Sequence, residues 1–359
     1  MSIQVKTSPP YYMLEEIHSQ PEWVDRLFQQ SDKDPVLQKV LQKLKNKKRI
    51  FFTGCGTSHY TAQAGAALAR HLLQEANPVQ SVPAAELYHH WELSTEDALL
   101  AVTHAGETHM VLELLKKARK CGALTVVLTG FPDSQAARNA SYVLSTGYAL
   151  EKSWAHTISF TLGAALLLVV SAHLAESRGY TVPWETIRSG PEQIQQVLDQ
   201  SARIQEQAKA FLSKEKWLVA GTGTSLATAH ETALKVVETS YIPAIPLDLE
   251  QVLHGFLAGC DPKTLLLVSA PFASQQERVQ ELIRAAEKIS LSLLFLAPSG
   301  LLHQTPRLPV PECHPLLVPL VHTTATHLFV YYRTVCKGMN PDLIRRDQAP
   351  YAAARKEYR

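Results

Sequence analysis

The stretch Ile50-Phe-Phe-Thr-Gly-Cys-Gly-Thr-Ser58 decides the fold, because it recurs as Trp217-Leu-Val-Ala-Gly-Thr-Gly-Thr-Ser225. In both copies an apolar, β-rich run leads into Gly-x-Gly-Thr-Ser, and a helical pattern follows. A repeat of this kind constrains the architecture more firmly than local propensity does. We therefore expect two copies of one structural unit in this chain.

The repeat continues beyond the glycine turn. Two further apolar runs recur in the same order and at nearly the same spacing, with Leu99–Thr103 corresponding to Leu265–Ser269 and Leu124–Thr129 corresponding to Leu291–Leu296. Helical patterns at residues 110–120 and 275–289 separate these runs, which is typical of βαβ units in a parallel sheet buried on both faces. The pattern predicts an α/β fold of two duplicated three-layer α/β/α domains, each doubly wound around a parallel sheet.

The length of 359 residues also favours two domains, because a single core rarely grows beyond about 250–300 residues. A hydrophobic content of 46% with 19% charged residues is that of a globular protein. The expected order is an N-terminal helical lead-in at 1–45, a first α/β domain at 46–188, a helical connector at 189–213, a second α/β domain at 214–338 and a C-terminal tail at 339–359.

Charge and cysteine usage exclude several classes of function. A net charge of +2 gives no support to a nucleic-acid partner. The five cysteines are scattered, without the paired spacing of a disulfide framework or a zinc site, so we interpret them as free thiols in a reducing cytosol. We expect neither a metal nor a cofactor.

Two apolar segments bear on localisation. The N-terminus lacks the apolar core of a signal peptide. The run at 162–175 is interrupted by polar residues and too short to span a bilayer, so it is interpreted as a buried helix. We therefore expect a cytoplasmic protein with no membrane partner.

The first glycine turn has the residues of an anion site. Gly54 and Gly56 lie where backbone N–H groups and a helix N-terminus converge, and Thr57 and Ser58 add hydroxyl groups. The alternative is a tight chain reversal with no ligand. Duplication does not decide between them, because it copies a structural turn as readily as a functional one.

A second polar loop follows the next strand of the first half. It runs Thr103-His104-Ala105-Gly106-Glu107-Thr108, and loops after neighbouring parallel strands share the edge where ligands bind. The corresponding loop of the second half, at 269–273, contains Pro271 instead. We therefore expect one phosphate site per chain, in residues 54–60 and 103–108, and expect Gly221 to Ser225 to cap the helix that follows.

That following helix carries three charged residues on one face. Glu231, Lys235 and Glu238 are spaced i, i+4 and i+7, which stacks them along one side of the helix. They could form an exposed salt-bridged stripe. Alternatively, because the stretch at 226–245 is otherwise largely apolar, they could form a partly buried carboxylate and lysine of the kind that provides a catalytic base.

In combination these motifs resemble the double sugar-isomerase (SIS) domain family. The resemblance covers residues 13–347 and rests on both phosphate-type loops, on Glu231-Thr-Ala-Leu-Lys235-Val-Val-Glu238 and on Leu253-His254-Gly255. The family includes the isomerase half of glucosamine-6-phosphate synthase, sugar-phosphate deaminases, ketose/aldose isomerases and fructosamine-6-phosphate deglycases.

The resemblance implies a phosphate held by the two loops of the first half. The candidate ligands are Gly56, Thr57, Ser58, Thr103, His104, Gly106 and Thr108. The usual serine before the glycine of the second loop is Ala105 here, so one expected phosphate hydroxyl is missing. We expect His104 to compensate for it.

The resemblance also implies roles in catalysis. Glu238 would be the base that moves a proton between C1 and C2 of the sugar, and Lys235 would be its partner. His254 would be the acid/base that opens the sugar ring, donated by the neighbouring subunit, which implies a homodimer with a composite active site. The family usually has proline after His-Gly, where this chain has Phe256.

A third segment resembles the loop that lines the sugar pocket of the family. It nominates Glu151, Ser153 and Thr157, although Ser153 and Thr157 could instead cap the helix that follows. The family's C-terminal lysine has no clear counterpart, and the candidates are Arg345, Arg346 and Lys356.

Three functions fit the resemblance. The favoured one is an enzyme that isomerises or deaminates an amino-sugar 6-phosphate, for which Lys235, Glu238 and His254 provide proton transfer. The alternatives are a fructosamine-6-phosphate deglycase and a non-catalytic sugar-phosphate sensor. The sequence shows no helix-turn-helix segment and no glutaminase segment ahead of the first half, so we expect neither a DNA-binding regulator nor ammonia transfer from glutamine by this chain alone.

Overall fold

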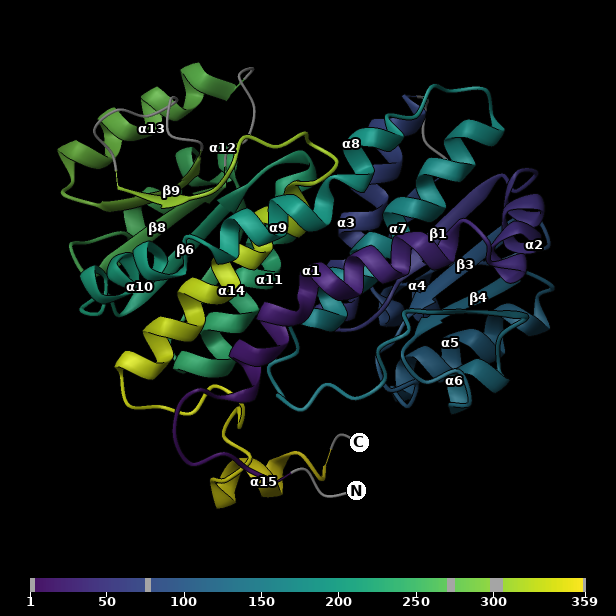
Figure 1. The fold of residues 1–359 in the computed structure, drawn as a ribbon, viewed down its shortest axis with the longest axis horizontal. Helices are drawn as coiled ribbons and strands as arrows, with labels where there is room; N and C mark the ends of the chain where they lie inside the picture. The colour runs from purple at the N-terminus through teal and green to yellow at the C-terminus, as the bar shows by residue number, and fades with distance from the viewer. Residues whose placement is uncertain (1–3, 75–78, 270–274, 298–305, 358–359) are drawn as a thin grey trace. The chain divides into compact units, whose positions relative to one another are not determined.

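The computed structural model describes residues 4–74, 79–269, 275–297 and 306–357 (Figure 1). The chain divides into two compact units, and each contains one sheet. The first-sheet unit comprises Glu22–Glu151, Ile158–Arg188 and Ala352–Arg359, and the second-sheet unit comprises Met1–Pro21, Lys152–Thr157 and Ser189–Tyr351. Helix α1 (Tyr12–Ser31) has residues in both units.

The first-sheet unit contains five parallel strands in the order β2-β1-β3-β4-β5. They are β1 (Arg49–Thr53), β2 (Val79–Ser81), β3 (Asp97–Val102), β4 (Leu124–Thr129) and β5 (Tyr142–Ser145). β3 and β4 are buried along their whole length, and β1 is buried except at its first residue, Arg49. Because these strands are parallel, their carboxyl ends meet at one edge of the sheet.

Helices cover both faces of this sheet. On one face, β-strand residues such as Phe51, Leu99 and Val127 pack into a cluster with α4 (Ala84–His90), α5 (His109–Lys120) and α6 (Gln135–Arg138). On the other, α3 (Thr57–Leu73) packs against β1 and against α7 (Ile158–Ser177). The unit also contains α2 (Pro35–Leu44) and α8 (Trp184–Arg188).

Helix α7 contains the apolar run that the sequence interpreted as a buried helix. Among the described residues it is the one helix long and apolar enough to cross a membrane, and 89% of its most apolar window is buried inside the structure. The helix extends beyond the apolar run at both ends, so the expectation that the segment is too short to span a bilayer is wrong, whereas the interpretation as a buried helix agrees with the structure.

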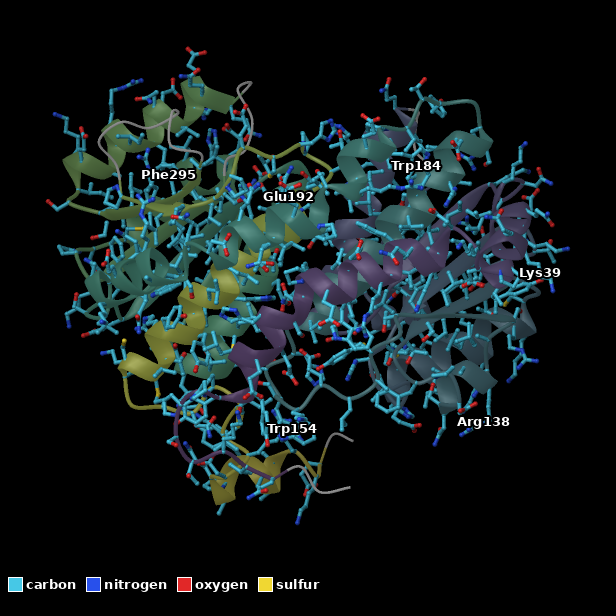
Figure 2. The ribbon with its side chains drawn as sticks, viewed as in Figure 1. Lys39, Arg138, Trp154, Trp184, Glu192 and Phe295 are labelled. Atoms are coloured by element: carbon cyan, nitrogen blue, oxygen red, sulfur yellow. The ribbon has the colours of Figure 1, made fainter. Side chains whose placement is uncertain are left out.

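The second-sheet unit repeats the architecture, with parallel strands in the order β10-β9-β8-β6-β7. They are β6 (Lys216–Gly221), β7 (Ala244–Asp248), β8 (Thr264–Ser269), β9 (Ser292–Ala297) and β10 (Arg307–Pro309). Phe295 of β9, labelled in Figure 2, is fully buried in the cluster that this sheet forms with α12 (Leu249–Leu253) and α13 (Gln276–Lys288).

The opposite face of the second sheet is covered by α11 (Leu226–Ser240), against which α14 (Val318–Cys336) packs. α9 (Gly190–Leu198) and α10 (Ser201–Ala210) pack in turn on α14 (Figure 1). The short 3-10 helices are η1 (Gly223–Ser225) and η2 (Phe256–Gly259), and the last helix is α15 (Ala349–Ala354). The predicted duplicated α/β fold with parallel sheets is confirmed.

The segment after α11 contains Pro243 and Pro246, yet residues 244–248 form the edge strand β7, paired with β6. Pro246 is compatible with an edge strand, because one side of an edge strand forms no hydrogen bonds with another strand. Pro271, on which the contrast between the polar loops of the two halves depends, lies outside the described residues.

Candidate functional site

The two glycine turns have the same backbone geometry. A Cβ atom at Gly54 would lie 2.6 Å from the carbonyl carbon of Ser58, and one at Gly221 would lie 2.4 Å from the carbonyl oxygen of Ser225. The second glycine of each turn has a positive φ, 56° at Gly56 and 58° at Gly223. Both positions therefore favour glycine because the chain folds back closely on itself.

The polar groups of the second turn are used within the protein. Thr222 and Ser225 form a capping box at η1, and the Ser225 hydroxyl donates to the backbone oxygen of Ser269 at 2.8 Å. The Ser269 hydroxyl in turn lies 2.9 Å from Nδ1 of His322 on α14. The second turn is thus capped at η1, whereas Ser225, the N-cap residue of α11, makes no side-chain capping bond to that helix, so a capping role toward α11 stays a prediction.

The first turn faces a pocket within the first-sheet unit. The pocket is lined mainly by hydroxyl side chains, glycines and one imidazole, namely Thr57, Ser58, Thr61, Val102, Thr103, His104, Leu128, Thr129, Gly130, Thr146, Ser159 and Gly163. These residues come from the carboxyl ends of β3, β4 and β5 and from the first turns of α3 and α7. Thr57 and Ser58 are half-buried, whereas Cys55 and Gly56 are exposed.

The loop after β3 supplies four of the predicted phosphate ligands. The hydroxyls of Thr103 and Thr108 lie 3.3 Å apart, and Thr103 is buried whereas Thr108 is exposed. Gly106 has a φ of 70°, and a Cβ there would lie 2.0 Å from Oγ of Ser134. The loop is thus held in one conformation that only glycine fits at this position.

His104 and Glu151 are neighbours in the same unit. Burial lowers the pKa of His104 below its usual value, and the Glu151 carboxylate opposes that shift in part. Glu151 accepts hydrogen bonds from the backbone N–H groups of Ile158 at 2.9 Å and Ser159 at 3.3 Å, so its carboxylate occupies the N-terminus of α7. A carboxylate oxygen of Glu151 and a ring nitrogen of His104 lie within 4.8 Å of each other.

Ser153 and Thr157 belong to the second-sheet unit and are fully buried. The backbone N–H of Ser153 faces the Glu16 carboxylate at 3.3 Å, and its hydroxyl bonds to Asp342. Asp342 also accepts from Tyr12 and Met13, each at 2.9 Å. Ser153 therefore ties its loop to the start of α1 and to the C-terminal segment, and its role toward a sugar stays a prediction.

The charged face of α11 is buried. Glu231 is 0% exposed, Lys235 is 1% exposed and the side chain of Glu238 is 24% exposed. Lys235 Nζ donates to Glu238 Oε2 at 2.6 Å and lies 3.3 Å from Glu231 Oε1. The structure thus brings Lys235 and Glu238 together in a buried cluster and excludes the exposed salt-bridged stripe.

A seam of buried threonines fixes α11 against α14. The hydroxyl pairs Thr228 with Thr323, Thr232 with Thr326 and Thr239 with Thr334 are each separated by 2.8–2.9 Å. Between them, Nε2 of His327 on α14 lies 3.4 Å from Glu231 Oε1. The charged cluster is therefore held by paired side chains from a second helix.

His254 lies outside this cluster, at the C-terminus of α12. Its side chain is 71% exposed, and its ion-pair partner is Glu250, at 3.5 Å. Gly255 follows with a φ of 131°, and Phe256 is 40% exposed. Among the C-terminal candidates, Arg345 lies over the ring of Tyr241 and Arg346 over that of Trp154, which Figure 2 labels, while Lys356 is exposed.

Several residues at these sites were not predicted from the sequence. Among them, Thr61, Thr129, Thr146 and Ser159 line the pocket with hydroxyl groups, and His327 joins the charged cluster. The four hydroxyl residues follow from the topology, since each stands near a strand end or a helix start at the carboxyl edge of the sheet. His327 has no local signal, because it stands in a helix that is buried nearly all round.

Comparisons with known proteins agree with this fold. Residues 43–172 match the SIS domain family. The chain is 27% identical over 347 residues to glutamine–fructose-6-phosphate aminotransferase (isomerizing) of Thermococcus kodakarensis, covering 94% of this chain and 57% of that protein. It is 30% identical over 344 residues to the protein of the same name from Pyrococcus horikoshii, covering 92% and 56%. The chain therefore spans about half the length of the curated relatives it matches.

One solved structure resembles the whole described architecture. The C-terminal domain of glucosamine-fructose-6-phosphate aminotransferase from Francisella tularensis superposes with a TM-score of 0.84 at 22% identity, covering 94% of this chain and 99% of that one. At this identity the likeness concerns the fold, and the SIS-type fold expected from the sequence is confirmed.

Proposed function

We propose that this chain isomerises an amino-sugar 6-phosphate, deaminates it, or does both. The proposal rests on the match of residues 43–172 to the SIS domain family and on homology to the isomerase half of glutamine–fructose-6-phosphate aminotransferase. The reaction would transfer a proton between C1 and C2 of the open-chain sugar. Homology to these proteins supports a reaction of the phosphosugar isomerase type.

The pocket of the first-sheet unit supports the binding of a phosphate. It offers hydroxyl groups of Thr57, Ser58 and Thr103 beside the N-terminus of α3. A helix N-terminus and hydroxyl donors together stabilise a phosphate dianion without requiring a lysine or arginine. In the second turn the corresponding serine hydroxyl is already bonded within the protein. This contrast supports one phosphate site per chain.

The observation that carries the catalytic proposal is the buried Lys235–Glu238 pair. A lysine that is 1% exposed costs folding free energy unless carboxylates compensate for its lost hydration, and replacing such a pair with apolar residues is often neutral or stabilising. A purely structural role therefore explains poorly why the pair stands in the core of α11. Proton transfer to carbon requires such a carboxylate, held in place and only partly hydrated.

Within the cluster, Glu238 is the residue suited to meet a substrate. It is the one member of the three on α11 with appreciable exposure, and its Oε2 is positioned by Lys235. In the proposed reaction, Glu238 removes the proton from C2 and returns it at C1, or the reverse. Lys235 stabilises the negative charge that develops on the adjacent oxygen. His254 is proposed to open the ring.

The decisive variant is Glu238→Gln, assayed with a panel of aldose, ketose, amino-sugar and fructosamine 6-phosphates for ketose and ammonia release. We expect turnover to fall by roughly 10³-fold while binding of the phosphosugar changes little. The matched control is Glu215→Gln, which removes the carboxylate of an exposed ion pair with Lys263 at 3.0 Å. This variant should leave turnover unchanged. Loss of binding in Glu238→Gln would assign this residue to recognition instead.

The panel also separates the alternatives for the wild-type protein. Release of ammonia identifies a deaminase, and ketose without ammonia identifies an isomerase. Release of an amine only from fructosamine 6-phosphates identifies a deglycase. Binding without any product identifies a sensor and rejects the enzymatic proposal.

We further propose a homodimer in the cytoplasm, in which His254 acts in the partner's site. The high exposure of His254 supports this arrangement. Mixing inactive Glu238→Gln and His254→Gln proteins should restore up to about a quarter of the activity if subunits exchange at random. Mixtures that stay inactive, although they form mixed dimers, would place both residues in one subunit's site.

A further inference from the structure

We propose that His327 is a positioning residue for this reaction, which fixes the charge of Glu231 and so keeps Lys235 on Glu238. The inference rests on the proposed function and deepens it. It adds a residue from α14 to the cluster of α11, and this residue has no counterpart among the motifs that identify the family in this sequence.

The geometry links His327 to the reactive end of the cluster in three steps. Nε2 of His327 lies 3.4 Å from Oε1 of Glu231, and both side chains are 0% exposed. The same Glu231 oxygen lies 3.3 Å from Nζ of Lys235. Nζ of Lys235 then donates to Oε2 of Glu238 at 2.6 Å. One carboxylate oxygen is thus shared by an imidazole and an ammonium group.

The three charged groups on α11 do not balance without one additional proton. Two ionised carboxylates and one ammonium leave an excess negative charge, which is costly in a buried site. One additional proton, carried by the His327 imidazole or by Glu231, makes the cluster neutral. Because the two groups are in contact, that proton belongs to the pair and not to either residue alone.

The proton of the His327–Glu231 pair determines which of the two carboxylates Lys235 contacts more closely. If Glu231 had no other cation beside it, it would compete with Glu238 for the ammonium group. With the proton of the pair in place, the attraction of Glu231 for Lys235 is reduced. Lys235 then keeps its shorter contact, 2.6 Å to Glu238 against 3.3 Å to Glu231. Its positive charge is thereby directed to the carboxylate that we propose as the base.

The described charged groups on α9, α10 and α14 contact other partners or solvent. α9 and α10 pack on α14 through buried apolar residues such as Ile194 and Ile204, and their charged side chains are exposed, including Glu192, which Figure 2 labels. On α14 itself, His322 contacts Ser269 and Arg333 donates to the backbone oxygen of Lys214 at 2.9 Å. By contrast, Glu231 on α11 lies 3.4 Å from His327.

The first test compares the pH profiles of kcat for wild type, His327→Gln and His322→Gln between pH 6 and pH 9. His322 is a matched control, because it is equally buried on the same helix but contacts Ser269. We expect His327→Gln to lower kcat by about tenfold or to move one limb of the profile by about one pH unit, with KM changed by less than about threefold. His322→Gln should keep the wild-type profile. An unchanged profile in His327→Gln would overturn the inference.

The second test does not depend on turnover. The His327 imidazole is titrated by ¹⁵N NMR in the wild-type protein and in Glu231→Gln, which removes the negative charge beside it. We expect the midpoint of His327 to fall by about one pH unit or more, while that of His322 is unchanged. A His327 midpoint that does not move refutes the coupling. If the coupling is present but no phosphosugar is turned over, the proposed function fails and the charge assignment stands.

Discussion

His322 makes the pH dependence of stability predictable in the second-sheet unit. Its side chain is 1% exposed, and burial lowers its pKa to about 4. Its Nδ1 is paired with the hydroxyl of Ser269. The folded protein therefore holds this histidine neutral over a pH range in which an unfolded chain protonates it.

The magnitude follows from proton linkage. In the unfolded chain a histidine titrates near pH 6.5, so between about pH 6.5 and about pH 4 the unfolded state binds one proton that the folded state does not. The contribution of neutral His322 to the free energy of unfolding is fully present above about pH 6.5. It falls with decreasing pH by about 1.4 kcal/mol for each pH unit. The total loss attributable to His322 is about 3 kcal/mol.

The assay is urea unfolding at several values between pH 4 and pH 7, followed by hydrogen exchange of peptides from α14, so that the second-sheet unit is observed alone. In His322→Gln the group that titrates is absent, and glutamine can still bond to Ser269. We expect the unfolding free energy of this variant to depend less steeply on pH, by about 1.4 kcal/mol per pH unit. Parallel curves for the two proteins would refute the argument that burial keeps His322 neutral.

Two further predictions concern the loop after β3. Gly106→Ala should destabilise the first-sheet unit by roughly 3 kcal/mol in urea unfolding, because the added Cβ would lie 2.3 Å from Cβ of Ser134. The control Gly179→Ala has a φ of 90° but open space around it, and should destabilise the unit by only about 1 kcal/mol. Equal destabilisation by the two substitutions would contradict the packing argument. Ala105→Ser restores the hydroxyl usual in the family and should tighten binding of inorganic phosphate by roughly fivefold in calorimetry, whereas unchanged affinity would argue against phosphate binding by this loop.

The central strands of both sheets could be predicted because they are continuous apolar runs in a duplicated order. β1, β3 and β4 are buried on both faces, so their sequences contain little else. The edge strands lack this signal. β2 and β10 are three residues long, and β7 contains a proline that a central strand could not accommodate.

The candidate site divides in the same way. The spacing of Glu231, Lys235 and Glu238 placed them on one helical face, and the structure decides that this face is buried. Sequence spacing could not reveal His327, because it meets Glu231 through the packing of α14 on α11. Contacts between elements far apart in the chain depend on side-chain packing, which no local period encodes.

The two glycine turns indicate how a duplicated binding motif can lose its ligand while it keeps its shape. In both turns the first glycine is required by the backbone of the serine four residues later, and the second glycine has a positive φ. The difference lies in the partners of the hydroxyl groups. The Ser225 hydroxyl donates to the backbone oxygen of Ser269 at the end of β8, and the Ser269 hydroxyl contacts His322. These two hydroxyl groups are therefore already satisfied within the protein.

A hydroxyl that already donates within the protein must give up that bond before it can donate to an anion. The half-buried Thr57 and Ser58 of the first turn line a pocket, whereas the Ser225 hydroxyl of the second turn donates to the backbone of Ser269 at the end of β8. This argues that the sequence repeat preserves the turn for folding in both halves, and that the contacts around each turn differ in what they leave for the phosphate that we propose.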